Sequence, residues 1–301
     1  MIRIVTDSVS SLPREIAEQE NVEVVSLYLN VEGKEYSDLE MDIDTFYERI
    51  YEMAGNPPTS SQPSQAKLEA LFESIAKAGD ELLGIWISSK LSGAFEGVLR
   101  AARAVESRNI GFSYCMIDSS SCGYDEVFPV LAGIRSVKEG KTLKEAATDV
   151  LKSIKSTRFL FTPESLTFLQ KGGRIGGAAA LLGNLIKLSP VLTVVDGIPQ
   201  AMAKVRTQKK ALAKMVSILE EDVAACGGLK NLVVHYIGEK TPALTWAHEV
   251  IEPLLGRSVD VKPVSPVVGL HVGPAVGIAY ECNEALSGKI TKDLSSLAVF
   301  N

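Results

Sequence analysis

Short apolar runs alternate with amphipathic stretches along the first half of the chain. The runs are brief and carry few polar residues, as expected of buried strands, and lie at 2–6, 22–29, 82–87 and 112–117. Between them, apolar residues recur at helical spacing around residue 16 and at 43–53, 66–78 and 94–105. This alternation predicts βαβ units, and therefore an α/β fold with a parallel sheet and helices on both of its faces.

The pattern changes after a capping box at 142–145, which predicts a helix that ends near Lys155. A strand is predicted at 158–161, and Thr162 and Pro163 then predict a helix with proline at its first position. An Asp-Gly pair at 196–197 predicts a hairpin between 191–195 and 200–205.

The rest of the second half contains further strands and helices, which predict a mixed sheet. The predicted helices are 178–186 and one opened by Thr241 and Pro242, and the predicted strands are 232–236, 259–264 and 275–280. We place the domain change near residue 160, which gives an N-terminal α/β domain of residues 1–160 and a C-terminal α/β domain of residues 161–301.

Composition limits the classes of function. The length of 301 residues suits roughly two domains of about 150 residues. With 46% hydrophobic and 23% charged residues the chain is expected to be ordered, and its net charge of −6 argues against a nucleic-acid partner. The uncharged stretch 263–280 is interrupted by prolines and glycines, so it does not predict a membrane helix. The first residues lack signal-peptide organisation, and we expect a soluble cytoplasmic protein.

Cysteine and histidine positions give no sign of a metal site. The four cysteines, which form no CxxC pair, are expected to be buried free thiols: Cys115, Cys122, Cys226 and Cys282. His235 and His248 fall on a predicted strand and a predicted helix without ligand spacing, and we interpret them as structural.

Two loops of the first half are rich in hydroxyl groups. They are 56–64 (N-P-P-T-S-S-Q-P-S) and 88–93 (S-S-K-L-S-G), which follows a buried strand. One interpretation is a solvated loop in which Ser64 caps the next helix. The other is a neutral cradle for an anion, in which Gly93 lets a ligand approach the backbone. The presence of two such loops favours the second interpretation.

Two motifs of the second half have equally open interpretations. Residues 171–174 (K-G-G-R) either end a helix with cations at its carboxyl end or offer the Arg174 guanidinium to a carboxylate or phosphate. Their spacing is not that of a phosphate-binding P-loop. His271, within 269–274 (G-L-H-V-G-P), is either a core residue or part of a ligand site.

Together, these motifs resemble those of the DegV family. Thr-Asp-Ser follows the first strand at 6–8, residues 60–64 resemble T-S-Q-P-S, and residues 87–93 resemble I-S-S-x-L-S-G. The segments 169–175 and 269–274 complete the set, in the same order along nearly the whole chain. The DegV family comprises bacterial fatty-acid-binding proteins that serve as the lipid-presenting subunit of fatty acid kinase.

The resemblance implies a two-domain protein that holds one long-chain fatty acid in a tunnel between its domains. Ser60 and Ser92 match the hydroxyl residues that bind the carboxylate, and His271 matches a histidine near the carboxylate. Ser61 and Gly93 lie beside the two serines and are expected to bind the ligand as well. Arg174 matches an arginine tied to phosphoryl transfer by a separate ATP-dependent kinase subunit. The resemblance thus implies a lipid-presenting subunit without independent catalysis, metal or cofactor.

This chain departs from the family pattern at several positions. Ser60 replaces the usual threonine and keeps the hydroxyl, and the other differences are Ala94, Ser189 and Ala275. Two alternatives stay open: a carrier of another amphiphilic carboxylic acid, and a hydrolase with Ser92 as nucleophile and His271 as base. The hydrolase would need a G-x-S-x-G elbow or an orienting acid, and the sequence shows neither.

Overall fold

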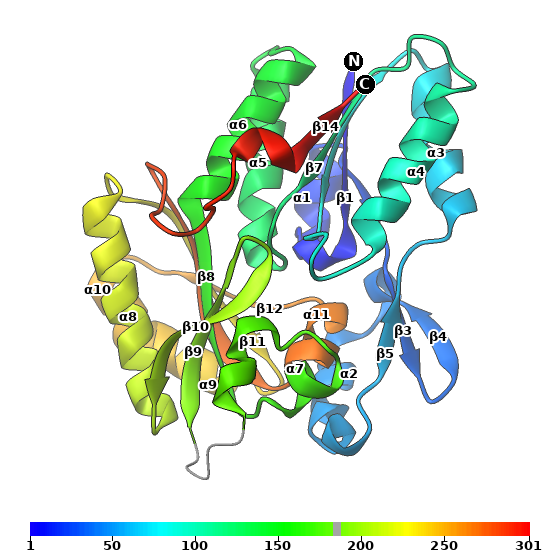
Figure 1. Cartoon of the computed structure of the whole chain (residues 1–301). Coiled ribbons are helices and arrows are strands. Elements are labelled where there is room, and N and C mark those ends of the chain that lie inside the picture. The colour runs from blue at the N-terminus through cyan, green and yellow to red at the C-terminus, as the bar shows by residue number, and fades with distance from the viewer. Residues whose placement is uncertain (183–187) are drawn as a thin grey trace.

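The fold consists of two large sheets, each with its own helices, and a small three-stranded sheet beside them (Figure 1). The structure is a computed structural model, and it describes residues 1–182 and 188–301. Both chain ends lie at the same end of the molecule, beside the first sheet (Figure 1).

The first sheet has the strand order β14-β7-β6-β1-β2. Its strands are β1 (Ile2–Asp7), β2 (Glu23–Val25), β6 (Glu81–Trp86), β7 (Tyr114–Asp118) and β14 (Ala298–Phe300). The pairs among β7, β6, β1 and β2 are parallel, as the sequence predicted, and β14 joins the edge antiparallel to β7. The last strand of the chain therefore completes the sheet of the first half.

Helices cover both faces of this sheet, which confirms the predicted fold class. Neighbouring residues of a strand point to opposite faces of the sheet. Ile4 and Val5 therefore belong to two different clusters of buried hydrophobic side chains, one on each face. Ile4 packs with α5 (Tyr124–Lys138) and α6 (Leu143–Ser156), whereas Val5 packs with α3 (Gln65–Lys77) and α4 (Ala94–Glu106). The predicted capping box is present at the start of α6.

The predicted strand 22–29 was wrong as a single element. The chain leaves the first sheet after β2 and enters the small sheet, which has the order β4-β3-β5 with β3 (Tyr28–Val31), β4 (Lys34–Ser37) and β5 (Thr59–Ser61). Between β2 and β3, the Ser26 hydroxyl donates to the carbonyl of Leu27, and the Leu27 N–H donates to the Ser8 hydroxyl. These bonds replace the strand ladder at this point and divide the predicted strand in two.

The second sheet is mixed, as predicted, with the order β10-β9-β8-β13-β11-β12. Its strands are β8 (Thr157–Pro163), β9 (Ser189–Val195), β10 (Ile198–Val205), β11 (Leu229–Ile237), β12 (Asp260–Pro263) and β13 (Ala275–Cys282). The chain thus crosses between sheets at β8 and returns for β14, and the domain division at 160 stays a prediction. The hairpin β9–β10 turns at Asp196 and Gly197, as expected.

Opposite faces of the second sheet meet different parts of the molecule. Arg158 and Tyr280 both bond to Asp222 on α8 (Gln208–Ala225), so their side of the sheet faces this helix. Phe159 and Phe161 alternate with Arg158 along β8 and therefore face the first half of the chain.

The remaining helices are short. They are α1 (Arg14–Gln19), α2 (Ile43–Arg49), α7 (Thr167–Lys171), α9 (Thr241–Trp246), α10 (Glu252–Leu255) and α11 (Pro266–Val272). Single turns of 3-10 or π type are η1 (Ser8–Ser10), η2 (Asp38–Glu40), η3 (Ile50–Gly55), η4 (Gly176–Leu181), η5 (Ala247–Ile251) and η6 (Leu294–Leu297).

Two helix predictions in the second half were wrong. Thr162 and Pro163 pair with β13 and end a strand, and helix α7 begins later at Thr167. In its described part, the predicted helix 178–186 belongs to the 3-10 turn η4 and is followed by an extended Leu182. This segment begins against β10, where Gly176 and Gly177 lie too close to Pro199 and Gln200 to accept a Cβ. Residues 183–187 lie outside the described part.

The expected burial of the cysteines is confirmed, since all four are free and buried. Among the described residues, no helix has the length and apolarity required to cross a membrane.

Candidate ligand-binding site

A narrow apolar cavity of about 60 Å³ lies between the two halves of the chain. Val9, Ile87, Leu91 and Cys122 line it from the first half, and Phe159, Phe161, Leu169, Val194, Pro199, Val267, Val268 and Val272 line it from the second. Its polar lining side chains are Arg174 and His271.

A smaller apolar cavity of about 20 Å³ lies next to the first and shares part of its lining. Five residues line both cavities: Cys122, Phe159, Phe161, Val268 and Val272. The second cavity ends among Tyr124, His235 and Tyr236. We call the first cavity the head cavity and the second the tail cavity.

His271, which lines the head cavity, is hydrogen-bonded to a residue from the opposite half of the chain. The Ser60 hydroxyl on β5 lies 2.8 Å from Nε2 of His271 on α11. The Nδ1 atom of His271 is buried and has no hydrogen-bond partner in the described part of the chain. Two residues that the sequence singled out separately therefore meet at one point.

Helix α11 is fixed by groups from the first half. The buried carboxylate of Asp38 accepts bonds from the Ser265 hydroxyl at 2.7 Å and the Val267 N–H at 3.1 Å. The Tyr47 hydroxyl donates to the carbonyl of Val264 at 2.6 Å. Sequence reasoning missed Asp38 and Tyr47, because neither belongs to a recognisable motif and both act through contacts more than 200 positions away.

Burial keeps the His271 imidazole neutral. It lowers the pKa of His271 to about 4, and the nearby Arg174 guanidinium lowers it further in the same direction. A neutral imidazole carries one donor and one acceptor nitrogen, so at Ser60 it can either give or take a proton in the hydrogen bond.

Arg174 joins the turn after α7 to the loop that carries Ser92. Its Nε donates to the carbonyl of Leu91 at 3.2 Å, and its NH1 donates to the carbonyl of Gly172 at 2.6 Å. The guanidinium is therefore placed beside both Ser92 and His271. A cation at this end of an apolar cavity favours an anionic ligand group.

The loop 88–93 is anchored by Asp7 at the end of β1. The Asp7 carboxylate accepts the N–H groups of Val9 at 2.9 Å and of Ile87 at 2.8 Å. Burial raises the pKa of Asp7 to about 7. At the other end of the loop, the Ser92 hydroxyl accepts the N–H of Ala94 at the start of α4. The hydroxyl-rich loop 88–93 therefore lies just beyond the end of a strand, as the sequence predicted.

The structure separates two predicted residues from this group. Ser61 follows Ser60 on strand β5, so its side chain takes the opposite side, where its hydroxyl donates to Glu35 at 3.0 Å. Gly93 has ordinary helical dihedral angles, and a Cβ there would make only normal contact with Gln62. Their roles in binding stay predictions.

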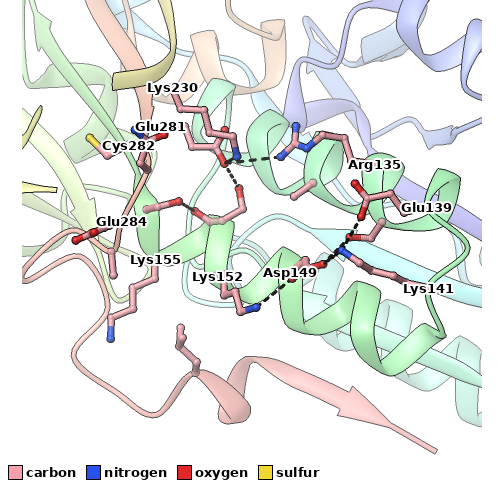
Figure 2. Close-up of a pocket in the computed structure, with 17 residues that line it drawn as sticks. Arg135, Glu139, Lys141, Asp149, Lys152, Lys155, Lys230, Glu281, Cys282 and Glu284 are labelled. Carbon is pink, nitrogen blue, oxygen red and sulfur yellow. Dashed lines mark hydrogen bonds and ion pairs between the residues drawn. The ribbon is translucent and has the colours of Figure 1, made fainter. Parts of the chain in front are cut away.

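A polar pocket elsewhere on the molecule has a different character (Figure 2). Its walls carry ion pairs: the buried Glu281 binds Lys230 at 2.9 Å and Ser153 at 2.9 Å, and Asp149 binds Lys141 at 2.8 Å. Figure 2 shows these two groups side by side along α6. Because most of its lining is polar and several of its charges pair with one another, this pocket connects α6 to β13 and suits a long apolar chain poorly.

The described residues contain no group of His, Cys, Asp or Glu suited to a metal ion. The site is therefore built from hydroxyl groups, one neutral imidazole and one guanidinium at the end of an apolar cavity.

Comparison with known proteins identifies relatives over almost the whole chain. A family model described as "Uncharacterised protein, DegV family" matches residues 1–283. A DegV domain-containing protein of Clostridium perfringens is 36% identical over 280 residues, which cover 93% of this chain and 98% of that protein.

Solved structures agree in fold. A DegV family protein from Thermus thermophilus, described for its fatty acid binding, has a TM-score of 0.81 at 28% identity and covers 93% of this chain and 99% of its own. A stearic acid-binding protein from Eubacterium ventriosum has a TM-score of 0.83 at 25% identity, covering 94% and 99%. The chain belongs to the DegV family.

Proposed function

We propose that this protein binds a long-chain fatty acid in the head and tail cavities and presents its carboxylate to a separate ATP-dependent fatty acid kinase subunit in the cytoplasm. The observation that carries the proposal is the apolar cavity whose polar lining residues are Arg174 and His271, the latter hydrogen-bonded to Ser60. Relatives of the same fold are described as binding fatty acids, including stearic acid.

The chemistry of the cavity suits an amphiphilic acid. Each methylene buried against the apolar walls contributes about 0.8 kcal/mol, so a long chain supplies most of the affinity. Hydroxyl donors such as Ser60 and Ser92 can orient the carboxylate without pairing it in a strong ion pair. The carboxylate oxygen then stays nucleophilic.

Presentation to a kinase follows from this arrangement. The carboxylate oxygen would attack the γ-phosphorus of ATP on the partner subunit, the bond to the ADP oxygen would break, and an acyl phosphate and ADP would form. Arg174 would stabilise the negative charge on the transferred phosphoryl group. The chain would serve as the lipid-presenting subunit and would need no cofactor of its own.

The hydrolase alternative receives less support from the geometry. Nε2 of His271 is engaged with Ser60, whereas the hydroxyl of Ser92 accepts a backbone N–H. No carboxylate among the described residues bonds to Nδ1 of His271, so the acid of a catalytic triad is missing there. We therefore favour the carrier, and a carrier of another amphiphilic acid is an outcome of its test.

Native mass spectrometry of the protein purified from bacteria tests this function. We expect a bound mass that corresponds to one fatty acid, and its fragmentation identifies the chain. A different amphiphilic acid in the cavity would replace the proposed ligand class. An apo mass that does not shift after addition of stearic acid would contradict the proposal.

A further inference from the structure

The tail cavity contains a polar side chain that the proposed function does not use. His235 lies on β11, is 5% exposed and lines the tail cavity. Both of its ring nitrogens are buried, and neither makes a hydrogen bond of ordinary geometry within the described part of the chain. Such groups are rare in folded proteins, because a buried polar atom without a partner is costly.

The surroundings hold the imidazole in place. Tyr124 and Phe159 contact it with ring centroids 6.2 Å and 6.0 Å away. On its other side lies Gly277, the partner of His235 in the sheet, where a Cβ would be 2.1 Å from Nε2 of the imidazole. A glycine at this position is thus what allows the ring to lie over β13.

The neighbouring groups satisfy at most one of the two ring nitrogens of His235. The Tyr124 hydroxyl already donates to the carbonyl of Pro263 at 3.1 Å. The carbonyl of Leu160 acts as a weak hydrogen-bond acceptor for one ring nitrogen, and it opposes in part the lowering of the His235 pKa to about 4 that burial causes. The ring is therefore neutral near pH 7, with one donor and one acceptor nitrogen.

Of all polar groups, a hydroxyl fits this environment best. It can donate to one ring nitrogen or accept from the other, whereas a charged group would lose its hydration without gaining a counter-charge. A plain alkyl chain would fill the tail cavity and leave at least one ring nitrogen unpaired. A site with polar groups prepared for a hydroxyl discriminates against the analogue that lacks it.

We infer that His235 in the tail cavity recognises a hydroxyl group carried by the acyl chain, so that the ligand class includes hydroxylated fatty acids. This inference rests on the proposed function, since the acyl chain must first occupy the head cavity with its carboxylate near Ser60. The hydroxyl lies away from the carboxylate, because the tail cavity is reached through the walls formed by Phe159 and Phe161.

Displacement of a fluorescent fatty acid from delipidated protein tests the inference. The competitors are stearic acid and a series of monohydroxystearic acids in which the hydroxyl moves along the chain. We expect at least one isomer to bind about tenfold more tightly than stearic acid, the size of one satisfied buried hydrogen bond. In His235→Leu this ratio should fall to about one, and His235→Gln, which keeps a donor and an acceptor, should retain part of it.

The possible outcomes distinguish failure of this inference from failure of the proposed function. If stearic acid binds the wild type and no hydroxylated isomer binds more tightly, the inference is wrong and the proposed function stands. A preference that persists in His235→Leu overturns the role of His235. If neither stearic acid nor any isomer displaces the probe, the proposed function itself fails. Competition by stearic acid and the hydroxylated isomers on the wild type shows whether a hydroxyl group is preferred, even if His235→Leu does not fold.

Discussion

The Ser60 hydroxyl lies 2.8 Å from Nε2 of His271, although 211 positions separate the two residues in the chain. Ser60 comes from the small sheet of the first half and His271 from a helix of the second half, so this bond joins the two halves beside the head cavity. Asp38 and Asp7 hold the two adjoining segments in place. The predictions below follow from this arrangement.

Removal of either predicted carboxylate hydroxyl should weaken fatty acid binding. A hydrogen bond to a charged group contributes about 1.5–3 kcal/mol, so Ser60→Ala and Ser92→Ala should each raise the Kd for stearic acid about tenfold or more. Fluorescent displacement measures this change. Ser217→Ala, which removes a hydroxyl that bonds to Glu221 on the solvent side of helix α8, is the matched control and should leave the Kd unchanged. Wild-type affinity in both site variants would contradict the proposed carboxylate position.

Arg174→Ala should retain lipid but lose acyl-phosphate formation with the partner kinase. The apolar walls supply most of the affinity, whereas the guanidinium is proposed to act on the transferred phosphoryl group. We expect at least a hundredfold lower rate of acyl-phosphate formation, with bound lipid still detected by mass spectrometry. Arg206→Ala removes an exposed arginine and serves as the control. Undiminished phosphorylation of lipid bound to Arg174→Ala would remove Arg174 from the mechanism.

Asp7 should give the stability of the fold a defined pH dependence. Burial raises its folded-state pKa to about 7 from an ordinary value of 3.8, so between these pH values the folded chain binds more protons than the unfolded chain. This contribution to stability is complete below pH 4 and is lost as the pH rises through 7.

The variant Asp7→Asn removes that titration. Compared with this variant, the wild type should lose stability between pH 5 and pH 7.5, by up to about 1.4 kcal/mol per pH unit. Urea denaturation at the two pH values measures the difference, and titrations that both proteins share cancel. A difference in stability that stays constant or moves in the other direction would show that Asp7 is not protonated by burial.

Gly277→Ala should destabilise the second sheet. The added Cβ would lie 2.1 Å from Nε2 of His235 and 2.3 Å from the carbonyl oxygen of Leu160, and the backbone atom cannot move away cheaply. We expect a loss of about 1–3 kcal/mol in the free energy of unfolding, typical of overpacking. Gly55→Ala, where no atom lies within 4 Å of the new Cβ, is the control. Equal stability of the two variants would contradict the packing described around Gly277.

The sequence predicts much of the fold because its strong signals are local. Buried apolar runs, the capping box at Thr142 and the Asp-Gly turn at 196–197 depend on neighbouring residues, and each is present in the structure. The errors fall where distant contacts decide. Ser8 helps to divide the strand that passes through Leu27, and pairing with β13 keeps Pro163 extended.

The same contrast between local signals and distant contacts applies to the candidate site. Motifs predicted that Ser60, Ser92, Arg174 and His271 belong to the site. Their closeness in space depends on the fold and cannot be predicted from any local sequence pattern. Asp38 was missed because a lone acidic residue in a sequence resembles any solvated side chain, and only its burial against α11 shows its role.

The central claim concerns where a fatty acid lies, and a crystal structure of the protein with stearic acid tests it most directly. The account predicts the carboxylate within hydrogen-bonding distance of the Ser60 and Ser92 hydroxyl groups, and the chain passing between Phe159 and Val268 into the tail cavity. A carboxylate at the opposite end, or stearic acid bound outside these cavities while they stay empty, would contradict it.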